Sequence, residues 1–325
     1  MENEILILAQ GLKKYFQPRG FFGLKNNFIK AVDDISLEIY KGETFGLVGE
    51  SGCGKSTLGR TLIRMYEPTG GSIFYKGEDI THIKASQLKM LENRFQIIFQ
   101  DPYMALDPFW NVGEILEEPL RRIGMDSGQW TNKIKDILEK VGLGSDDVHK
   151  FPYEFSGGQR QRIGIARALA VNPEFIMCDE PIAALDVSIQ AQVVNLLQDL
   201  QEELGLTYLF TAHDLSMVRY ISTRIGVMYL GRIVEKAKSR ELFKNPLHPY
   251  TKLLLSSIPL PDPKNAVKKR KFKSVQEAAL TDVMRGCNFA PRCEYKTELC
   301  LCEVPILREL EAGHFVACHN TKEIN

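Results

Sequence analysis

The stretch GESGCGKS, residues 49–56, decides the fold. It fits the pattern G-x-x-x-x-G-K-[ST]. The preceding run, TFGLVG, is short and rich in strand-forming residues, and the following run, KSTLGRTLIRMY, has apolar residues at helical spacing. The sequence therefore predicts a strand, a glycine-rich turn and a helix in immediate succession.

This arrangement is suited to binding phosphate. Glycines let the backbone N–H groups turn inward toward phosphate oxygens, and the start of the helix adds its positive dipole end. Lys55 can reach the β- and γ-phosphates, and the hydroxyl of Ser56 can ligate Mg²⁺. We therefore expect a nucleoside triphosphate and Mg²⁺ to bind at Gly49, Glu50, Ser51, Gly52, Cys53, Gly54, Lys55, Ser56 and Thr57.

The composition describes an ordinary soluble protein. The chain has 325 residues, 44% apolar and 25% charged, with 41 acidic and 41 basic residues. Without net charge, no long-range field attracts nucleic acid or an anionic membrane. The opening MENEILILAQ is too short an apolar run for a signal peptide, and no stretch approaches the ~20 apolar residues that span a bilayer. We expect a cytosolic chain, in which stable disulfides are disfavoured.

Strand and helix patterns alternate along the chain. The runs ILILAQGL, FIKAVDDISLEIY, FIMCD and YLFTA are typical of strands, and VSIQAQVVNLLQDLQEEL of a helix. Between residues 101 and 155 the pattern is helical, in VGEILEEPLRRI and WTNKIKDILEKVGL. These patterns favour an α/β fold with a mainly parallel sheet and an inserted helical subdomain.

Two further motifs accompany the loop. FIMCDEP ends a buried strand in Asp179 and Glu180, whose side chains must point to opposite sides. Asp179 suits the Mg²⁺ shell, and Glu180 suits polarisation of an attacking water. FSGGQRQRIGIARALA places Ser156 and two glycines at a helix start, which is either a second anion site or an ordinary cap.

With these motifs in this order, residues 4–256 resemble the ATP-binding-cassette (ABC) ATPases. The resemblance implies an ABC-type P-loop NTPase core, with a RecA-like parallel sheet plus an antiparallel β subdomain, a helical subdomain at about 101–160 and a small C-terminal Cys-rich extension. The implied domains are 1–258 for the ATPase and 259–325 for a linker and extension. The linker contains a basic run, KKRK, that we expect to be solvated rather than to bind nucleic acid.

The resemblance also assigns roles to single residues. Phe16 would stack on adenine, Gln100 would contact Mg²⁺ and the attacking water, and His213 would contact the γ-phosphate. Asp186 would form the D-loop, and the signature that closes on a partner's nucleotide would comprise Ser156, Gly157, Gly158 and Gln159. Two positions depart from the family pattern, since Phe155 replaces a leucine and Ala183 a serine.

Finer resemblance narrows the class. FQDPYMALDP, DEPIAALDVSIQAQ and especially NPLHPYTKLLLSSIP are similar to ATP-binding subunits of oligopeptide and dipeptide importers. Such a subunit would sit peripherally on the cytoplasmic face of the membrane. Its partners would be two transmembrane permease subunits, a second ATPase subunit (a paralogue or itself) and, indirectly, an extracytoplasmic peptide-binding protein. The alternatives are a nickel or other small-solute importer, and a soluble ABC ATPase acting on nucleic acid or ribosomes.

Cysteines gather near the C-terminus. Cys287, Cys293, Cys300 and Cys318 follow a C-x5-C-x6-C-x17-C pattern. In some members of the resembled subfamily four such cysteines hold a [4Fe–4S] cluster, which takes four thiolates. Zinc, which favours tighter C-x2-4-C pairs, and unligated packing cysteines remain alternatives. We expect any metal here to be structural, leaving ATP binding independent of the extension.

Overall fold

The computed structural model describes residues 4–17, 28–257 and 285–321. The predicted linker, with its basic run, falls in 258–284 and lies outside the described residues. The chain forms two compact units, each described by itself. Unit 1 comprises Met1–Leu6, Ile39–Thr44 and His82–Ala212, and unit 2 comprises Ile7–Glu38, Phe45–Thr81 and His213–Asn325.

Unit 2 contains an antiparallel sheet near the N-terminus. Its order is β2-β1-β4-β5, and its strands are β1 (Ile5–Phe16), β2 (Ile29–Tyr40), β4 (Gly70–Tyr75) and β5 (Glu78–Asp79). Alternate residues of β2 are buried, including Ile35, Leu37 and Ile39, as the period-2 pattern predicts. This sheet confirms the expected antiparallel β subdomain.

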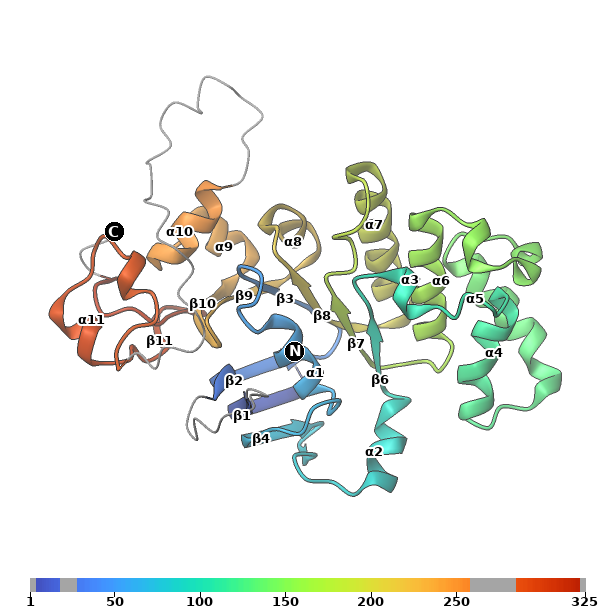
Figure 1. Ribbon diagram of the computed structural model, residues 1–325, viewed down its shortest axis with the longest axis horizontal. Helices are drawn as coiled ribbons and strands as arrows, with labels where there is room; N and C mark the ends of the chain where they lie inside the picture. The colour runs from blue at the N-terminus through green and yellow to red at the C-terminus, as the bar shows by residue number, and fades with distance from the viewer. Residues whose placement is uncertain (1–3, 18–27, 258–284, 322–325) are drawn as a thin grey trace. The chain divides into compact units, whose positions relative to one another are not determined.

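A second set of strands in unit 2 carries the phosphate loop and the C-terminal residues. In this set β3 (Thr44–Val48) pairs in parallel with β9 (Arg224–Tyr229). The antiparallel members that follow are β10 (Arg232–Lys238), β12 (His314–Val316) and β11 (Arg308–Glu311). The helices of this unit are α1 (Lys55–Leu62), α8 (Leu215–Ile221), α9 (Ser239–Lys244), α10 (Pro249–Ser256), η5 (Ala290–Arg292) and α11 (Glu298–Cys302). Figure 1 shows β11 and α11 in the orange-red C-terminal segment.

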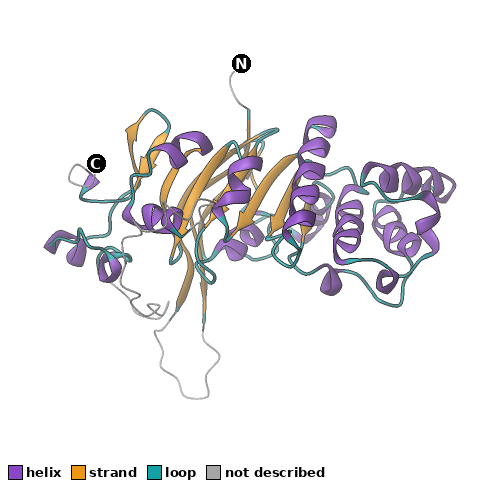
Figure 2. Ribbon diagram, turned by 90° about the horizontal axis from the view of Figure 1, so that it is seen from above, coloured by secondary structure: helices purple, strands orange, loops and turns teal. Residues whose placement is uncertain are grey.

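Unit 1 combines three parallel strands with a group of helices. β7 (Phe175–Asp179) pairs with both β6 (Phe95–Ile98) and β8 (Thr207–Ala212), and every residue of β7 and β8 is buried. The helices are α2 (Ala85–Glu92), α3 (Pro102–Ala105), α4 (Val112–Arg122), η1 (Ser127–Gln129), α5 (Trp130–Lys140), η2 (Ser145–His149), η3 (Pro152–Glu154), α6 (Gly157–Leu169) and α7 (Val187–Leu204). The end of this unit that holds α4, α5 and α6 contains helices only (Figure 2).

The predicted strands and helices are confirmed. The mixture of parallel and antiparallel strands with an all-helical insertion matches the α/β class. Helix α6 continues to Leu169, past the expected end of the helical subdomain at about 160. The domain limits at 258 and 259 stay predictions, because residues 258–284 lie outside the description. Among the described residues, no helix combines the length and apolarity needed to cross a membrane.

Candidate functional site

The glycine-rich loop joins β3 to α1 in unit 2. A Cβ atom on Gly49 would lie 2.2 Å from the carbonyl oxygen of Met228, and one on Gly54 would lie 2.0 Å from that of Ala31. Gly54 also has a φ of 109° as the residue before α1. The loop is therefore packed against other backbone from behind, and only glycine allows that approach.

Lys55 crosses the loop. Its ammonium group donates to the carbonyl oxygens of Gly49 at 2.8 Å and Glu50 at 3.2 Å, and the residue is 4% exposed. Folding back in this way holds a positive charge beside the loop backbone. The arrangement suits an anion with several oxygens, as the sequence predicts.

The side chain of Cys53, unlike those at the tip of the loop, is buried. Burial raises the pKa of its thiol. Its carbonyl oxygen accepts the N–H of Gly231 at 2.9 Å. Cys53 therefore contributes backbone to the loop while its side chain packs inside the protein. Ser51 and Gly52, at the tip, are exposed.

Glu50 is held at two points. Its N–H donates to the phenolic oxygen of Tyr250 at 2.9 Å. Its carboxylate forms a two-armed ion pair with the guanidinium of Arg292, at 2.8 and 2.9 Å. Neither contact was predicted from the sequence, and no local pattern signals the ion pair, because Arg292 lies 242 positions from Glu50.

Phe16, the predicted adenine-stacking residue, is half-buried at the end of β1. Its ring meets that of Tyr66 edge-on, with centroids 5.7 Å apart. The ammonium group of Lys14 lies 5.1 Å from the Phe16 centroid. The Phe16 ring therefore contacts two other side chains of unit 2, Tyr66 and Lys14.

The two acids of unit 1 occupy different environments. Asp179 is 3% exposed, and its Oδ1 accepts from the hydroxyl of Thr211 at 3.3 Å. The N–H of Glu180 donates to the same hydroxyl oxygen at 3.0 Å. Glu180 is half-buried and has a φ of 47°, a left-handed conformation that costs energy for a non-glycine residue. Such backbone strain concentrates at functional sites.

The predicted signature begins α6. The Ser156 hydroxyl accepts the N–H of Gln159 at 3.4 Å, and the Gln159 side chain accepts the N–H of Ser156 at 3.0 Å. This reciprocal pair is a capping box. A Cβ on Gly158 would lie 2.4 Å from a methyl group of Ile189 in α7, so close helix packing explains that glycine. Phe155, which departs from the family pattern, is buried.

The remaining predicted residues are exposed. Gln100 follows β6, Asp186 precedes α7, and His213 follows β8. The structure brings residues 49–57 together in unit 2 and places Asp179 and Glu180 side by side in unit 1. The roles assigned to single residues remain predictions.

The C-terminal cysteines form a loose group in unit 2. All seven cysteines are free thiols. Burial raises the pKa of Cys287 to about 11, and the neighbouring thiols of Cys300, Cys318 and Cys293 add to this shift. Within the described residues, however, no set of three or more His, Cys, Asp or Glu side chains is arranged to hold a metal ion.

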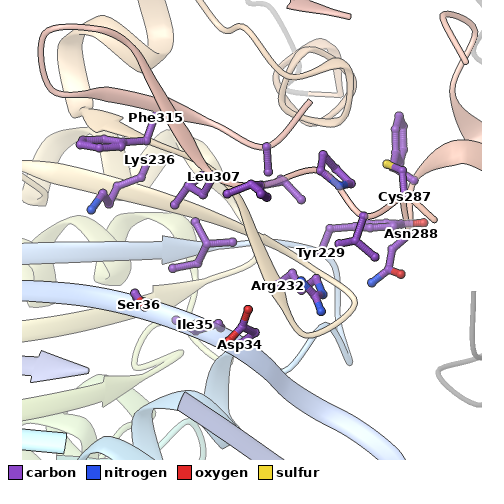
Figure 3. A pocket seen from close by; sticks show the side chains of 17 residues that line it. Asp34, Ile35, Ser36, Tyr229, Arg232, Lys236, Cys287, Asn288, Leu307 and Phe315 are labelled. Atoms are coloured by element: carbon purple, nitrogen blue, oxygen red, sulfur yellow. The ribbon is translucent and has the colours of Figure 1, made fainter. Parts of the chain in front are cut away.

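The extension packs on the strands of unit 2 and leaves a cavity of about 540 Å³ there. Figure 3 shows Cys287 and Asn288 at one end of the cavity and Lys236 and Phe315 at the other. The ammonium group of Lys236 lies 4.5 Å from the Phe315 ring centroid. Strand β12 and the cavity wall therefore attach the extension directly to β10.

Two family models match the chain. The model described as "ABC transporter" matches residues 32–183, and the one described as "Oligopeptide/dipeptide transporter, C-terminal region" matches residues 234–300. The latter range includes Tyr250 and Arg292. It therefore covers both residues that hold Glu50.

Similar proteins cover nearly the whole chain. The oligopeptide transport ATP-binding protein AppF of Bacillus subtilis is 48% identical, covering 98% of each chain. OppF of the same organism, also an oligopeptide transport ATP-binding protein, is 51% identical, covering 97% of each chain.

Solved structures share the fold. An ATP-binding cassette dimer described as a post-hydrolysis state bound to ADP and Pi is 29% identical, with a TM-score of 0.62 over 72% of this chain and 99% of that one. The chain cbiO1 from Clostridium perfringens has a TM-score of 0.66 at 24% identity, covering 74% of this chain and 92% of that one. The second likeness supports the cassette fold alone.

Proposed function

Since this chain belongs to the ATP-binding proteins of ABC transporters, we propose that it powers the import of oligopeptides or dipeptides by binding and hydrolysing ATP. The observation that carries this proposal is the loop of residues 49–54, which is packed against backbone behind it and crossed by Lys55. The similarity to two oligopeptide transport ATP-binding proteins supplies the cargo class.

The residues present fit ATP and Mg²⁺. The N–H groups of the loop and the ammonium of Lys55 would hold the phosphates, and Phe16 would stack on adenine. The Ser56 hydroxyl, Gln100 and Asp179 would hold Mg²⁺, which neutralises phosphate charge when bound. Glu180 would accept a proton from the attacking water, and His213 would contact the γ-phosphate.

Two such chains, or this chain and a paralogue, would act as a pair. One similar solved cassette is described as dimeric. In the pair, Ser156, Gly157, Gly158 and Gln159 would close on the nucleotide of the partner, with Asp186 beside it. The start of α6 supports this role because the N-terminus of a helix attracts anions, and Ser156 and Gln159 are exposed there.

An exposed apolar patch in unit 1 supports attachment to the permease. Four large side chains are exposed there: Tyr103 (64%), Met104 (86%), Phe109 (85%) and Trp110 (41%). One of the four, Trp110, also lines a cavity of about 320 Å³, together with Ala105, Asp107 and others. An apolar surface of this kind marks an interaction site. We place the permease here, and therefore the chain at the cytoplasmic face of the membrane.

The extension would carry a [4Fe–4S] cluster on Cys287, Cys293, Cys300 and Cys318, with zinc as the alternative. The N–H group of Asn320 donates to the sulfur of Cys318, two positions earlier, at 3.4 Å. Such bonds stabilise thiolates and are features of iron–sulfur sites. Closer approach of the thiols would accompany binding, since they are not arranged for a metal as they stand.

The patch and the attachment are tested by Met104→Ala. We expect this variant to bind ATP normally and to lose copurification with permease subunits from native membranes. Met90→Ala is the matched control, because Met90 is 74% exposed on α2 of the same unit. Copurification of the unaltered protein with ribosomes or DNA, and with no permease, would contradict the importer function.

A further inference from the structure

An ion pair joins the C-terminal extension to the phosphate loop. The two terminal nitrogens of Arg292 donate to the two carboxylate oxygens of Glu50, at 2.8 and 2.9 Å. This two-armed geometry is stronger and more directional than a single contact. The side chain of Arg292 is only 16% exposed, and that of Glu50 is 40% exposed.

The position of Arg292 is fixed by packing. It ends η5, three residues after Phe289, which is 2% exposed. The Phe289 ring packs against the rings of Tyr229 and Tyr250, with centroids 5.3 and 5.5 Å apart. The guanidinium of Arg292 lies 5.8 Å from the Tyr229 ring centroid. Tyr250 in turn accepts the N–H of Glu50, so one cluster holds both the backbone and the side chain of this residue.

Glu50 brings an electrostatic problem to its loop. It follows Gly49 directly, in a segment suited to bind a triphosphate, and a free carboxylate there would repel phosphate. Arg292 cancels that charge and turns the carboxylate toward the extension. In the part of the chain that the structure describes, the Glu50 carboxylate forms no other ion pair.

We propose that Arg292 is a positioning residue for nucleotide binding, which acts by neutralising Glu50 and holding it against the extension. The inference rests on the proposed function, because it assumes that residues 49–57 bind ATP. It differs from the expectation that ATP binding is independent of the extension. The extension would thus complete the electrostatics of the loop from a distant part of the sequence.

The test measures binding of a fluorescent methylanthraniloyl ATP to the full-length chain. Arg292→Met should raise the Kd for ATP about three- to tenfold, as expected for one uncompensated charge near a bound polyanion. Arg292→Lys should lie between this variant and the unaltered protein, because it keeps the charge and loses the two-armed geometry. Adding Glu50→Gln to Arg292→Met should restore most of the affinity.

Restoration by Glu50→Gln separates neutralisation from a purely structural role, because it returns no contact to the extension. Arg308→Met is the control, since Arg308 also belongs to the extension but donates to the Cys318 carbonyl and not to Glu50. It should leave the Kd unchanged. An unchanged Kd in Arg292→Met, or an equal loss in Arg308→Met without restoration by Glu50→Gln, would overturn the inference. Failure of the unaltered chain to bind ATP would instead overturn the proposed function.

Discussion

Acidification should destabilise this protein through His248. This residue is 1% exposed and precedes α10, where its Nδ1 accepts the N–H of Tyr250 at 3.0 Å. The backbone N–H of His248 donates to the carboxylate of Glu235 at 2.9 Å. Burial lowers the pKa of His248 to about 4, although the charge of Glu235 opposes the shift. The folded protein therefore needs a neutral ring, whose Nδ1 remains an acceptor.

The sign and size follow from the two pKa values. In the unfolded chain His248 takes up a proton as the pH falls below its ordinary pKa of about 6.5. In the folded protein it takes up a proton only as the pH falls to about 4. The unfolded state thus binds more protons between these values, and stability falls as the pH drops through this window. The full loss is about 3 kcal/mol below pH 4, and about 2 kcal/mol is lost by about pH 5.

The assay is urea unfolding, followed by circular dichroism, at about pH 7.5 and about pH 5. His248→Asn is the comparison, because asparagine can accept the Tyr250 N–H and does not titrate. Its free energy of unfolding should fall by about 2 kcal/mol less than that of the unaltered protein on acidification. Equal losses in the two proteins, or an NMR titration that places the His248 pKa near 6.5, would refute the reasoning.

Two further predictions concern the ATP site and the cysteines. Glu180→Gln should keep ATP binding and slow hydrolysis by ~10²–10⁴-fold, as expected for loss of a catalytic base. Lys55→Ala should instead weaken ATP binding. If the intact transporter carrying Glu180→Gln hydrolysed ATP at the normal rate, Glu180 would be excluded as the base. Protein purified without oxygen should be brown with about four irons per chain, and Cys300→Ser should remove the colour. Colourless protein with stoichiometric zinc would assign the site to zinc. Metal-free protein with an ordered extension would leave the cysteines as packing residues.

Local patterns predicted much of the architecture. The period-2 run in β2, the short apolar runs of β7 and β8 and the amphipathic helices α4 and α5 each carry their structure within a few residues. The phosphate loop is equally local, because its conformation depends on closely spaced glycines. These parts could be predicted because the forces that shape them act between near neighbours in sequence.

Contacts of the extension could not be predicted in this way. The Arg292–Glu50 pair and the buried pair of His314 and Glu235, which spans 79 positions, join segments that no periodicity relates. From the sequence we expected any metal bound by the extension to be structural. The extension also shares the interior of unit 2, where Phe289 and Val316 are buried. Composition alone does not reveal a core that is shared between distant segments.

The pairing of β12 with β10 also bears on aggregation. Strand β10 has five buried residues in a row, and an unpaired edge of that kind is a template for other chains. In this protein β12 covers that edge, and the outermost strand beyond it is β11, whose sequence RELE is short, fully exposed and charged. Charged short strands discourage edge-to-edge association. Proteolytic loss of β11 and β12 would leave the edge of β10 unpaired. An intact C-terminal segment would therefore help to prevent edge-to-edge pairing between neighbouring chains.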